Sequence, residues 1–392
     1  MKMINHLELR HFRNFTRIAL DFDSSLVLII GDNGTGKTSI LESLSLIGRS
    51  ENLLENTLAE LVCFNHNTLE NSQNGNPERY IENQGFSIYT KLNHQYYQDL
   101  ILNFYQKEGK KIFIVNGQAV AKNKIAEYRK YFINFIFLTP QIEQLFITNK
   151  SERRSYLDKI VGDIDLEHHH RISQYQKLLK ERMAILLNQQ QNPEAKNLIW
   201  LKIIEEKIAE IAVAIAFARV EAVIFFNKAI GEFDSEFPKL TLKITGETEE
   251  KIDQLNLVNA VELELEYREK LEKSRGHDMF SKKSNFGVHK SDFMAILLKN
   301  KILASQCSTG EQKSIMMAIT IARARISSLY KQQPTVLLLD EVFSHLDNDK
   351  IRAIFNEIIN CNLQCFLTAT NSKFIESANL EHKLIQIINL SQ

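Results

Sequence analysis

Residues 31–38 read Gly-Asp-Asn-Gly-Thr-Gly-Lys-Thr, which is a complete G-x-x-x-x-G-K-T phosphate loop. An apolar run at 26–30 precedes the loop and reads as a buried strand, and an amphipathic helical pattern follows it. The glycines let backbone amides surround a triphosphate, and Lys37 would reach its β- and γ-phosphates. The Thr38 hydroxyl would bind Mg²⁺. The residues predicted to bind a nucleotide in this segment are Gly31, Asp32, Asn33, Gly34, Thr35, Gly36, Lys37, Thr38 and Ser39.

Two acidic residues, Asp340 and Glu341, follow directly after a second apolar segment at 335–339. The carboxyl end of a buried parallel strand is where an α/β sheet presents its ligands. Asp340 would position Mg²⁺ together with Thr38. Glu341 is placed to polarise an attacking water as general base, so Glu341 and Lys37 are the predicted catalytic residues.

Residues 308–313 read Ser-Thr-Gly-Glu-Gln-Lys and open a segment with an apolar helical face. Ser308 and Glu311 alone have the spacing of a capping box, which is the purely structural interpretation. The functional interpretation is a second anion site at this helix terminus, aimed at a γ-phosphate. Because the segment lies just ahead of the Asp-Glu strand, the functional interpretation is favoured.

Together with residues 344–347, this order of motifs resembles the signature motif and D-loop of ABC-type ATPases. In that superfamily the signature of one protomer caps the nucleotide held by the phosphate loop of another. The resemblance therefore implies two nucleotides sandwiched between two chains. The residues concerned are Ser308, Gly310, Glu311 and Gln312 for the signature, acting in trans, and Ser344 and Asp347 for the D-loop.

The elements that position these motifs come from both ends of the chain. Alternating apolar residues predict strands in the first thirty residues and in 86–120, where Asn116-Gly117 is a hairpin turn signal. From about residue 152 helix formers dominate, and apolar residues from 204 to 225 follow a 4,3 spacing. That spacing fits either a coiled-coil seam or the core of a small helical bundle.

The expected fold class is therefore α/β. It comprises a discontinuous ABC-type P-loop ATPase domain with an antiparallel β subdomain and an inserted helical lobe. The expected boundaries are 1–150 for the N-terminal part of the ATPase domain, 151–285 for the helical lobe II, and 286–392 for the C-terminal part. The signature, Asp340 and the D-loop belong to that last part.

The bulk composition sets limits on partners and compartment. Formal net charge is +0 over 392 residues, so no global field attracts nucleic acid, and any DNA contact must use local basic patches. None of the four cysteines has C-x-x-C spacing, which favours reduced thiols and a cytosolic compartment. The longest apolar stretch is too short and too charged to span a membrane, and the N-terminus lacks a signal-peptide pattern.

Across essentially its whole length the chain resembles the RecF family of bacterial recombination mediators. Transport ATPases place signature and phosphate loop about a hundred residues apart, so the wide spacing here favours the chromosome-maintenance and repair branch. The family-like segments are 9–15, 138–158, 287–293 and 338–347. The first contains Phe-Arg-Asn, which implies that Arg13 lies near the nucleotide. Lys150 and Val288 stand where the family pattern has prolines, and Thr370 is a candidate γ-phosphate sensor in place of a switch histidine.

The resemblance implies an ATP-dependent DNA-binding clamp that dimerises when it binds ATP, with Mg²⁺ as a second cofactor. Its ATP hydrolysis is expected to be slow and to be stimulated by DNA. Such a protein acts with RecR and RecO on double- and single-stranded DNA at gaps. It aids RecA loading, replication restart and SOS induction. The alternative is an ABC-type ATPase of a defence or chromosome-structural system that works with an unknown partner.

Candidate DNA contacts are basic residues in several short patches. A solvated face is the ordinary explanation for most of them, and structural ion pairing is the alternative for the double arginine. The predicted contacts are Arg153, Arg154, Lys110 and Lys111, with Lys282 and Lys283 as a further basic pair.

Overall fold

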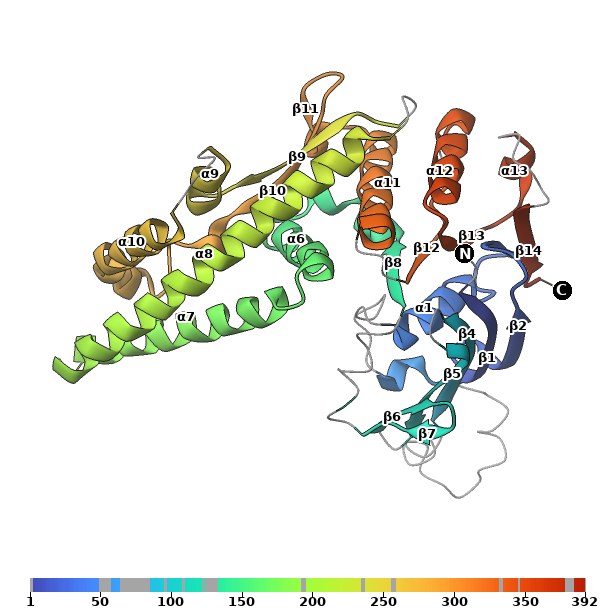
Figure 1. Cartoon of the computed structure of the whole chain (residues 1–392), viewed down its shortest axis with the longest axis horizontal. Coiled ribbons are helices and arrows are strands. Elements are labelled where there is room, and N and C mark those ends of the chain that lie inside the picture. Colours follow the sequence, from blue (N-terminus) through green and yellow to red (C-terminus); the bar gives the residue numbers. More distant parts are fainter. Residues whose placement is uncertain are drawn as a thin grey trace. The chain divides into compact units, whose positions relative to one another are not determined.

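A computed structural model gives the fold of the chain (Figure 1). It divides into two compact units, Met1–Glu143 with Met316–Gln392, and Gln144–Ile315. Both ends of the chain contribute to the first unit, as the sequence predicts. The residues described are 3–48, 58–63, 85–94, 97–107, 110–121, 124, 133–191, 195–233, 237–254, 259–330, 334–344, 346–377 and 384–391.

The first unit contains a five-stranded sheet in which neighbouring strands are parallel. The strand order is β14-β3-β13-β12-β8. Strands β8 and β12 are buried at every position, which explains why the last four residues of each are all apolar. The carboxyl ends of β3, β13 and β12 are adjacent, so the segments that follow them meet at one edge. The strands are β3 (Leu26–Ile30), β8 (Asn134–Leu138), β12 (Thr335–Leu339), β13 (Gln364–Ala369) and β14 (Ile385–Asn389).

A second, antiparallel sheet of six strands has the order β2-β1-β4-β5-β6-β7. The predicted hairpin turn joins β6 to β7, where Asn116 and Gly117 have φ of 48° and 79°. Two successive positive φ values are what a tight two-residue hairpin requires. The strands are β1 (Ile4–Phe12), β2 (Phe15–Asp21), β4 (Phe86–His94), β5 (Tyr97–Lys107), β6 (Lys110–Val115) and β7 (Gln118–Ala119).

Helix α1 (Lys37–Ile47) shares one hydrophobic core with both sheets of this unit. Apart from Thr38, all its residues are buried. Two of its buried serines are satisfied locally, since Ser43 and Ser45 each donate to a carbonyl three residues earlier, at 2.7 Å. The helix is therefore held on all sides, and its N-terminus has a fixed position.

Buried Gln364 at the start of β13 ties the first strand of the chain to the parallel sheet. Its Oε1 accepts from the amides of Met3 and Ile4 at 2.9 and 2.7 Å, and its Nε2 donates to the Ile4 carbonyl. The first unit also contains η1 (Leu58–Leu61), α5 (Pro140–Glu143), the π-helical η5 (Ile326–Tyr330), α12 (Asn348–Asn360) and α13 (Lys373–Ser377).

The second unit is built around three long helices, α7 (His168–Gln191), α8 (Ala195–Gly231) and α10 (Ala260–Ser281). The apolar seam predicted in 204–225 lies on α8, and its buried members pack with residues of α7 and α10. The helical-bundle interpretation therefore describes this segment. The other helices are η2 (Leu145–Ile147), α6 (Lys150–Ile164), α9 (Glu247–Gln254), η3 (Val288–Lys290) and η4 (Ala304–Gln306).

This unit extends past the expected end of the insertion, residue 285, to Ile315. The reason is a small antiparallel sheet of order β11-β10-β9, in which β10 pairs with β9 from within the insertion. The boundary falls inside helix α11 (Thr309–Arg325). The strands are β9 (Leu240–Thr245), β10 (Asp292–Leu297) and β11 (Ile302–Leu303).

Buried charges link the helices of the second unit. Arg219 of α8 is 1% exposed and donates to both oxygens of Asp158 and to Glu249. Burial alone would raise the pKa of Asp158, but hydrogen bonds from His168 and Arg219 outweigh it and lower that pKa.

No helix within the described ranges is long and apolar enough to cross a membrane.

Candidate nucleotide-binding site

The phosphate loop connects β3 to α1, which is the strand–loop–helix context that the sequence predicts. Gly34 and Gly36 have φ of 87° and 95°, a backbone region that side chains disfavour. At Gly36 space is also limited, because a Cβ there would lie 2.5 Å from the Phe15 ring. The backbone path of the loop thus requires glycine at positions 34 and 36.

The Lys37 ammonium lies within the curve of this loop. Its Nζ donates to the carbonyls of Gly31 and Asp32 at 2.8 and 3.0 Å, and lies 3.5 Å from Glu341 Oε1. The side chain is only 5% exposed, so its ammonium group is shielded from solvent and faces the phosphate loop. Phosphate oxygens bound there would meet a positioned cation and the N-terminus of α1.

Thr38 and Asp340 meet across the edge of the parallel sheet, as the sequence predicts for an Mg²⁺ site. The Thr38 hydroxyl lies 2.9 Å from Asp340 Oδ2 and 3.2 Å from Oδ1. Burial raises the pKa of Asp340, and the neighbouring charge of Glu341 adds to this, against hydrogen bonds from Thr368 and Thr38. A hydroxyl beside a carboxylate is a hard oxygen donor set that suits Mg²⁺.

Thr368 of β13 connects the two acidic residues. It is fully buried, and its hydroxyl donates to Asp340 Oδ1 at 2.6 Å while accepting from the Glu341 amide at 2.9 Å. Glu341 itself has φ of 51°, the left-handed conformation that a non-glycine residue rarely adopts. This role of Thr368 was not predicted from the sequence. Thr370, the candidate γ-phosphate sensor, stays a prediction. The available signal was a polar residue at the end of the otherwise apolar strand 365–368.

Residues 13 and 14 approach the site in different ways. Asn14 donates to the Gly34 carbonyl at 2.7 Å, so it holds the phosphate loop directly. The Arg13 guanidinium instead forms two 2.9 Å hydrogen bonds with Glu42 of α1 and one with the Glu60 carbonyl. Nucleotide binding by Arg13 stays a prediction, and its observed contacts secure α1.

The signature segment is described within the second unit. Ser308 and Glu311 form the predicted capping box, with the Ser308 hydroxyl and amide donating to Glu311 Oε2 at 2.7 and 2.9 Å. Gln312 donates to the Cys307 carbonyl at 2.9 Å. A Cβ added at Gly310 would meet no described atom within 4 Å, and φ there is not left-handed. The chain's own fold thus leaves this glycine unexplained.

The D-loop residues belong to the first unit. The Ser344 hydroxyl donates to the Glu341 carbonyl at 3.1 Å. Asp347 caps α12 by accepting from the Lys350 amide at 2.9 Å. Its pKa is lowered, because hydrogen bonds and charge from Lys350 outweigh the opposing effect of burial. A contact of either residue with a second protomer stays a prediction.

The predicted DNA contacts have mixed surroundings. Arg153 makes a bidentate ion pair with Asp292, with both distances 2.8 Å, so the ion-pairing alternative describes it. Arg154 donates to the Ser291 carbonyl at 2.8 Å, and burial lowers its pKa. Lys110 and Lys111 open β6, and their side chains lie outside the described part of the chain.

Comparison with known proteins supports this description of the fold. Residues 3–135 match the RecF/RecN/SMC N terminal domain family. A Rickettsia canadensis protein named DNA replication and repair protein RecF is 35% identical over 387 residues, which cover 98% of this chain and 99% of that one. A solved structure of the recombination mediator protein RecF-ATPrS has a TM-score of 0.76 at 21% identity and covers 100% of this chain and 97% of its own. The RecF-ATP structure has a TM-score of 0.72 at 22% identity and covers 94% and 92%.

The parallel sheet, the phosphate loop and the Thr38–Asp340 pair define an ABC-type P-loop ATPase fold. The solved RecF structures match this fold over 94% to 100% of the chain. Sequence identity extends over the same length. The chain belongs to the RecF family of DNA replication and repair proteins.

Proposed function

We propose that the chain is an ATP-dependent DNA-binding clamp of the RecF type, with slow ATP hydrolysis that DNA stimulates. ATP closes two copies of the chain around DNA, and hydrolysis releases it. The clamp acts at gaps in double- and single-stranded DNA together with RecR and RecO. It aids RecA loading, replication restart and SOS induction. Family membership and the geometry of the nucleotide site support this proposal.

The chemistry rests on residues of the first unit. Lys37 and the amides of the phosphate loop bind and orient the triphosphate, while Glu341 accepts a proton from the attacking water. Thr38 and Asp340 would hold Mg²⁺, which neutralises phosphate charge when bound. The 3.5 Å separation of Lys37 and Glu341 places the phosphate-binding cation next to the base. The Thr368 hydroxyl fixes the Asp340 carboxylate and the Glu341 backbone relative to each other.

Gly310 is the observation that carries the two-chain part of the proposal. The capping box explains Ser308 and Glu311 locally, but nothing described within the chain requires a glycine at 310. The backbone there is open, at the beginning of α11, where amides and the helix dipole favour an anion. A glycine in that position allows close approach of a group from outside the chain. The γ-phosphate held by a second copy is that group.

Sedimentation velocity of full-length variants tests this. Glu341→Gln should form a dimer with ATP and Mg²⁺, because binding is retained while hydrolysis is blocked. Lys37→Ala should stay monomeric. Adding Gly310→Arg or Ser308→Arg to Glu341→Gln should abolish the dimer. Adding Gly276→Arg should not, since Gly276 is an equally open glycine on α10 and provides the matched control.

A Glu341→Gln variant that stays monomeric at micromolar protein and saturating ATP would overturn the composite site. Retention of the ATP-dependent dimer in the Gly310→Arg variant would do the same. Circular dichroism of each variant separates these results from a failure to fold.

A further inference from the structure

Phe280, at the end of α10, is 88% exposed. Lys282 and Lys283 follow it, and both are exposed. Lys282 has φ of 54°, so it forms a left-handed C-cap that directs the chain away from the helix axis. An aromatic ring and two cations therefore occur together at one corner of the second unit.

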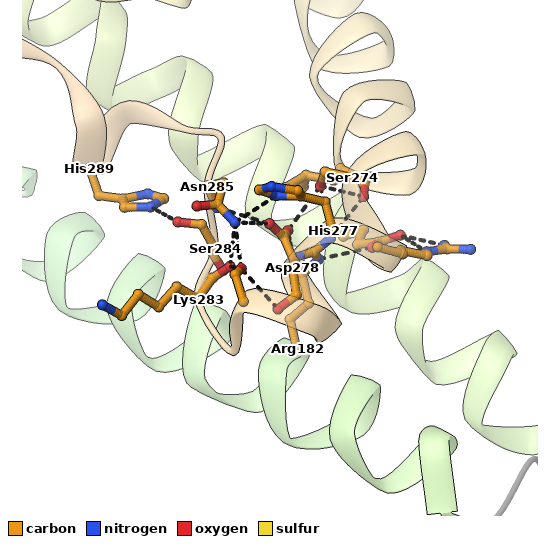
Figure 2. A network of polar contacts seen from close by, with 12 residues as sticks. Arg182, Ser274, His277, Asp278, Lys283, Ser284, Asn285 and His289 are labelled. Atoms are coloured by element: carbon orange, nitrogen blue, oxygen red, sulfur yellow. Dashed lines mark hydrogen bonds and ion pairs between the residues drawn. The ribbon is translucent and has the colours of Figure 1, made fainter.

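A polar network centred on the buried Asp278 joins the end of α10 to the loop that follows it (Figure 2). Asp278 is fully buried and accepts from Arg182 at 2.7 Å, and from both the amide and the side chain of Asn285 at 2.9 and 3.0 Å. Burial would raise the pKa of Asp278, but these hydrogen bonds outweigh it and lower that pKa. The His289 ring is hydrogen-bonded to the Ser284 carbonyl at 2.9 Å. The loop thus has a fixed backbone, and Figure 2 shows the Lys283 side chain pointing out of the network.

The other charges on the last turns of α10 have partners. Lys273 pairs with Glu269 at 3.5 Å, and Arg275 pairs with Glu272 at 3.1 Å and also with Glu205. Asp278 pairs with Arg182, which also pairs with Glu205. Within the described chain neither Lys282 nor Lys283 has an ion-pair partner. Beside Phe280 the local charge is therefore positive, although the whole chain has a formal net charge of +0.

We propose that Phe280, Lys282 and Lys283 form a contact site for single-stranded DNA, with a base stacked on the Phe280 ring and phosphates on the two lysines. The proposal rests on the DNA-binding function proposed above and locates one of its contacts. Aromatic rings beside basic groups are how proteins bind single strands without sequence preference. Because the loop is already ordered by Asp278, binding loses little conformational entropy.

A single strand fits these residues better than a duplex does. Duplex bases are stacked on one another, so a duplex offers phosphates to the lysines but no free base face to Phe280. An exposed phenylalanine would then remain unexplained. The two forms of DNA should respond differently to substitutions at these positions.

Fluorescence anisotropy with the full-length protein, using a labelled thymidine homopolymer and a labelled duplex of equal length, tests the site. Phe280→Ala should weaken homopolymer binding by about 5- to 150-fold, the effect expected for one lost stacked base. Duplex binding should change little, and Phe280→Trp should retain homopolymer affinity. Ile224→Ala, at another exposed apolar residue of the same unit, is the matched control and should be silent.

The lysines have their own test. Substituting both Lys282 and Lys283 with Gln should reduce the slope of log K against log salt for the homopolymer by about 1.4, since each phosphate contact contributes about 0.7. Lys299→Gln with Lys301→Gln removes the same charge elsewhere, and Lys301 likewise has a left-handed φ of 53°. That control should leave the slope unchanged.

Unchanged homopolymer affinity in Phe280→Ala would overturn the site, as would an equal loss with the duplex. Equal effects of the two lysine pairs would also overturn it. Each variant should still form the ATP-dependent dimer when combined with Glu341→Gln, so failure of this site is distinguishable from failure of the clamp.

Discussion

Replacing Thr368 with valine removes one hydroxyl and keeps the shape of the side chain. Thr368 is fully buried, and its hydroxyl joins the Asp340 carboxylate to the Glu341 amide. In the valine variant the amide loses its acceptor and Asp340 loses a donor. The left-handed backbone of Glu341, with φ of 51°, then lacks its hydrogen bond to the adjacent strand.

The size of the effect follows from these contacts. Leaving a buried polar group without a partner costs about 1–3 kcal/mol. If that free energy appears in the barrier to hydrolysis, kcat falls by about 5- to 150-fold. The phosphate loop and Lys37 are untouched by the change, so the Kd for ATP measured in EDTA should stay the same.

Steady-state hydrolysis and titration with a fluorescent ATP analogue separate the two effects. Thr368→Ser keeps the hydroxyl and removes only the methyl group, so it should retain most of the wild-type kcat. If Thr368 acted only through packing of its methyl group, Thr368→Ser would lose activity and Thr368→Val would not. The reasoning is refuted if Thr368→Val retains the wild-type kcat. It is also refuted if kcat and ATP affinity fall together in both variants.

Three further variants test other parts of the structure. Asp340→Asn should unfold at a higher temperature in EDTA, because the raised pKa of Asp340 means that its ionised form destabilises the folded chain at neutral pH; a lower unfolding temperature would contradict this. Asp278→Asn should instead lose about 3–5 kcal/mol in urea unfolding, because it breaks a buried ion pair with Arg182. The pKa of Asp278 is lowered on folding, so its contribution to the free energy of unfolding should be complete above the unfolded pKa of about 4. That contribution should disappear as the pH falls through the folded pKa. The Asn variant should lack this pH dependence. Gly36→Ala should abolish ATP binding in the same titration, because φ of 95° and the Phe15 ring exclude a side chain; wild-type affinity would show that the loop can rearrange.

Local sequence patterns were sufficient to predict the helices, strands and turns whose formation depends on residues close together in the chain. The run at 26–30 followed by the phosphate loop predicts β3 and α1, and Asn116-Gly117 predicts the β6–β7 turn. The second unit ends at Ile315, beyond the boundary at 285 that the sequence predicts for the helical insertion. Pairing of β10 with β9 is a long-range contact across the insertion, and no local pattern indicates it.

The same distinction applies to the candidate site. Lys37 and Asp340 belong to motifs whose spacing is visible in the sequence. The bond from Thr368 to Asp340 depends on which strands are neighbours, so it follows only from the sheet order. The ion pairs of Arg219 could not be predicted from a local pattern, because its partners Asp158 and Glu249 lie far from it along the chain.

The strand order of the parallel sheet has a consequence for the order of events during synthesis. Strand β3 lies between β13 and β14, so Leu26 pairs with Cys365 on one side and Ile385 on the other. Until β13 and β14 have emerged from the ribosome, β3 has no partners in this sheet and Asp340 has no Thr368 beside it. The second unit is continuous and fully translated by then, and we expect it to fold first. The phosphate loop is synthesised well before β13 and β14, yet its site is complete only when those strands pair with β3, so ATP can stabilise the assembled site only in chains that already contain them.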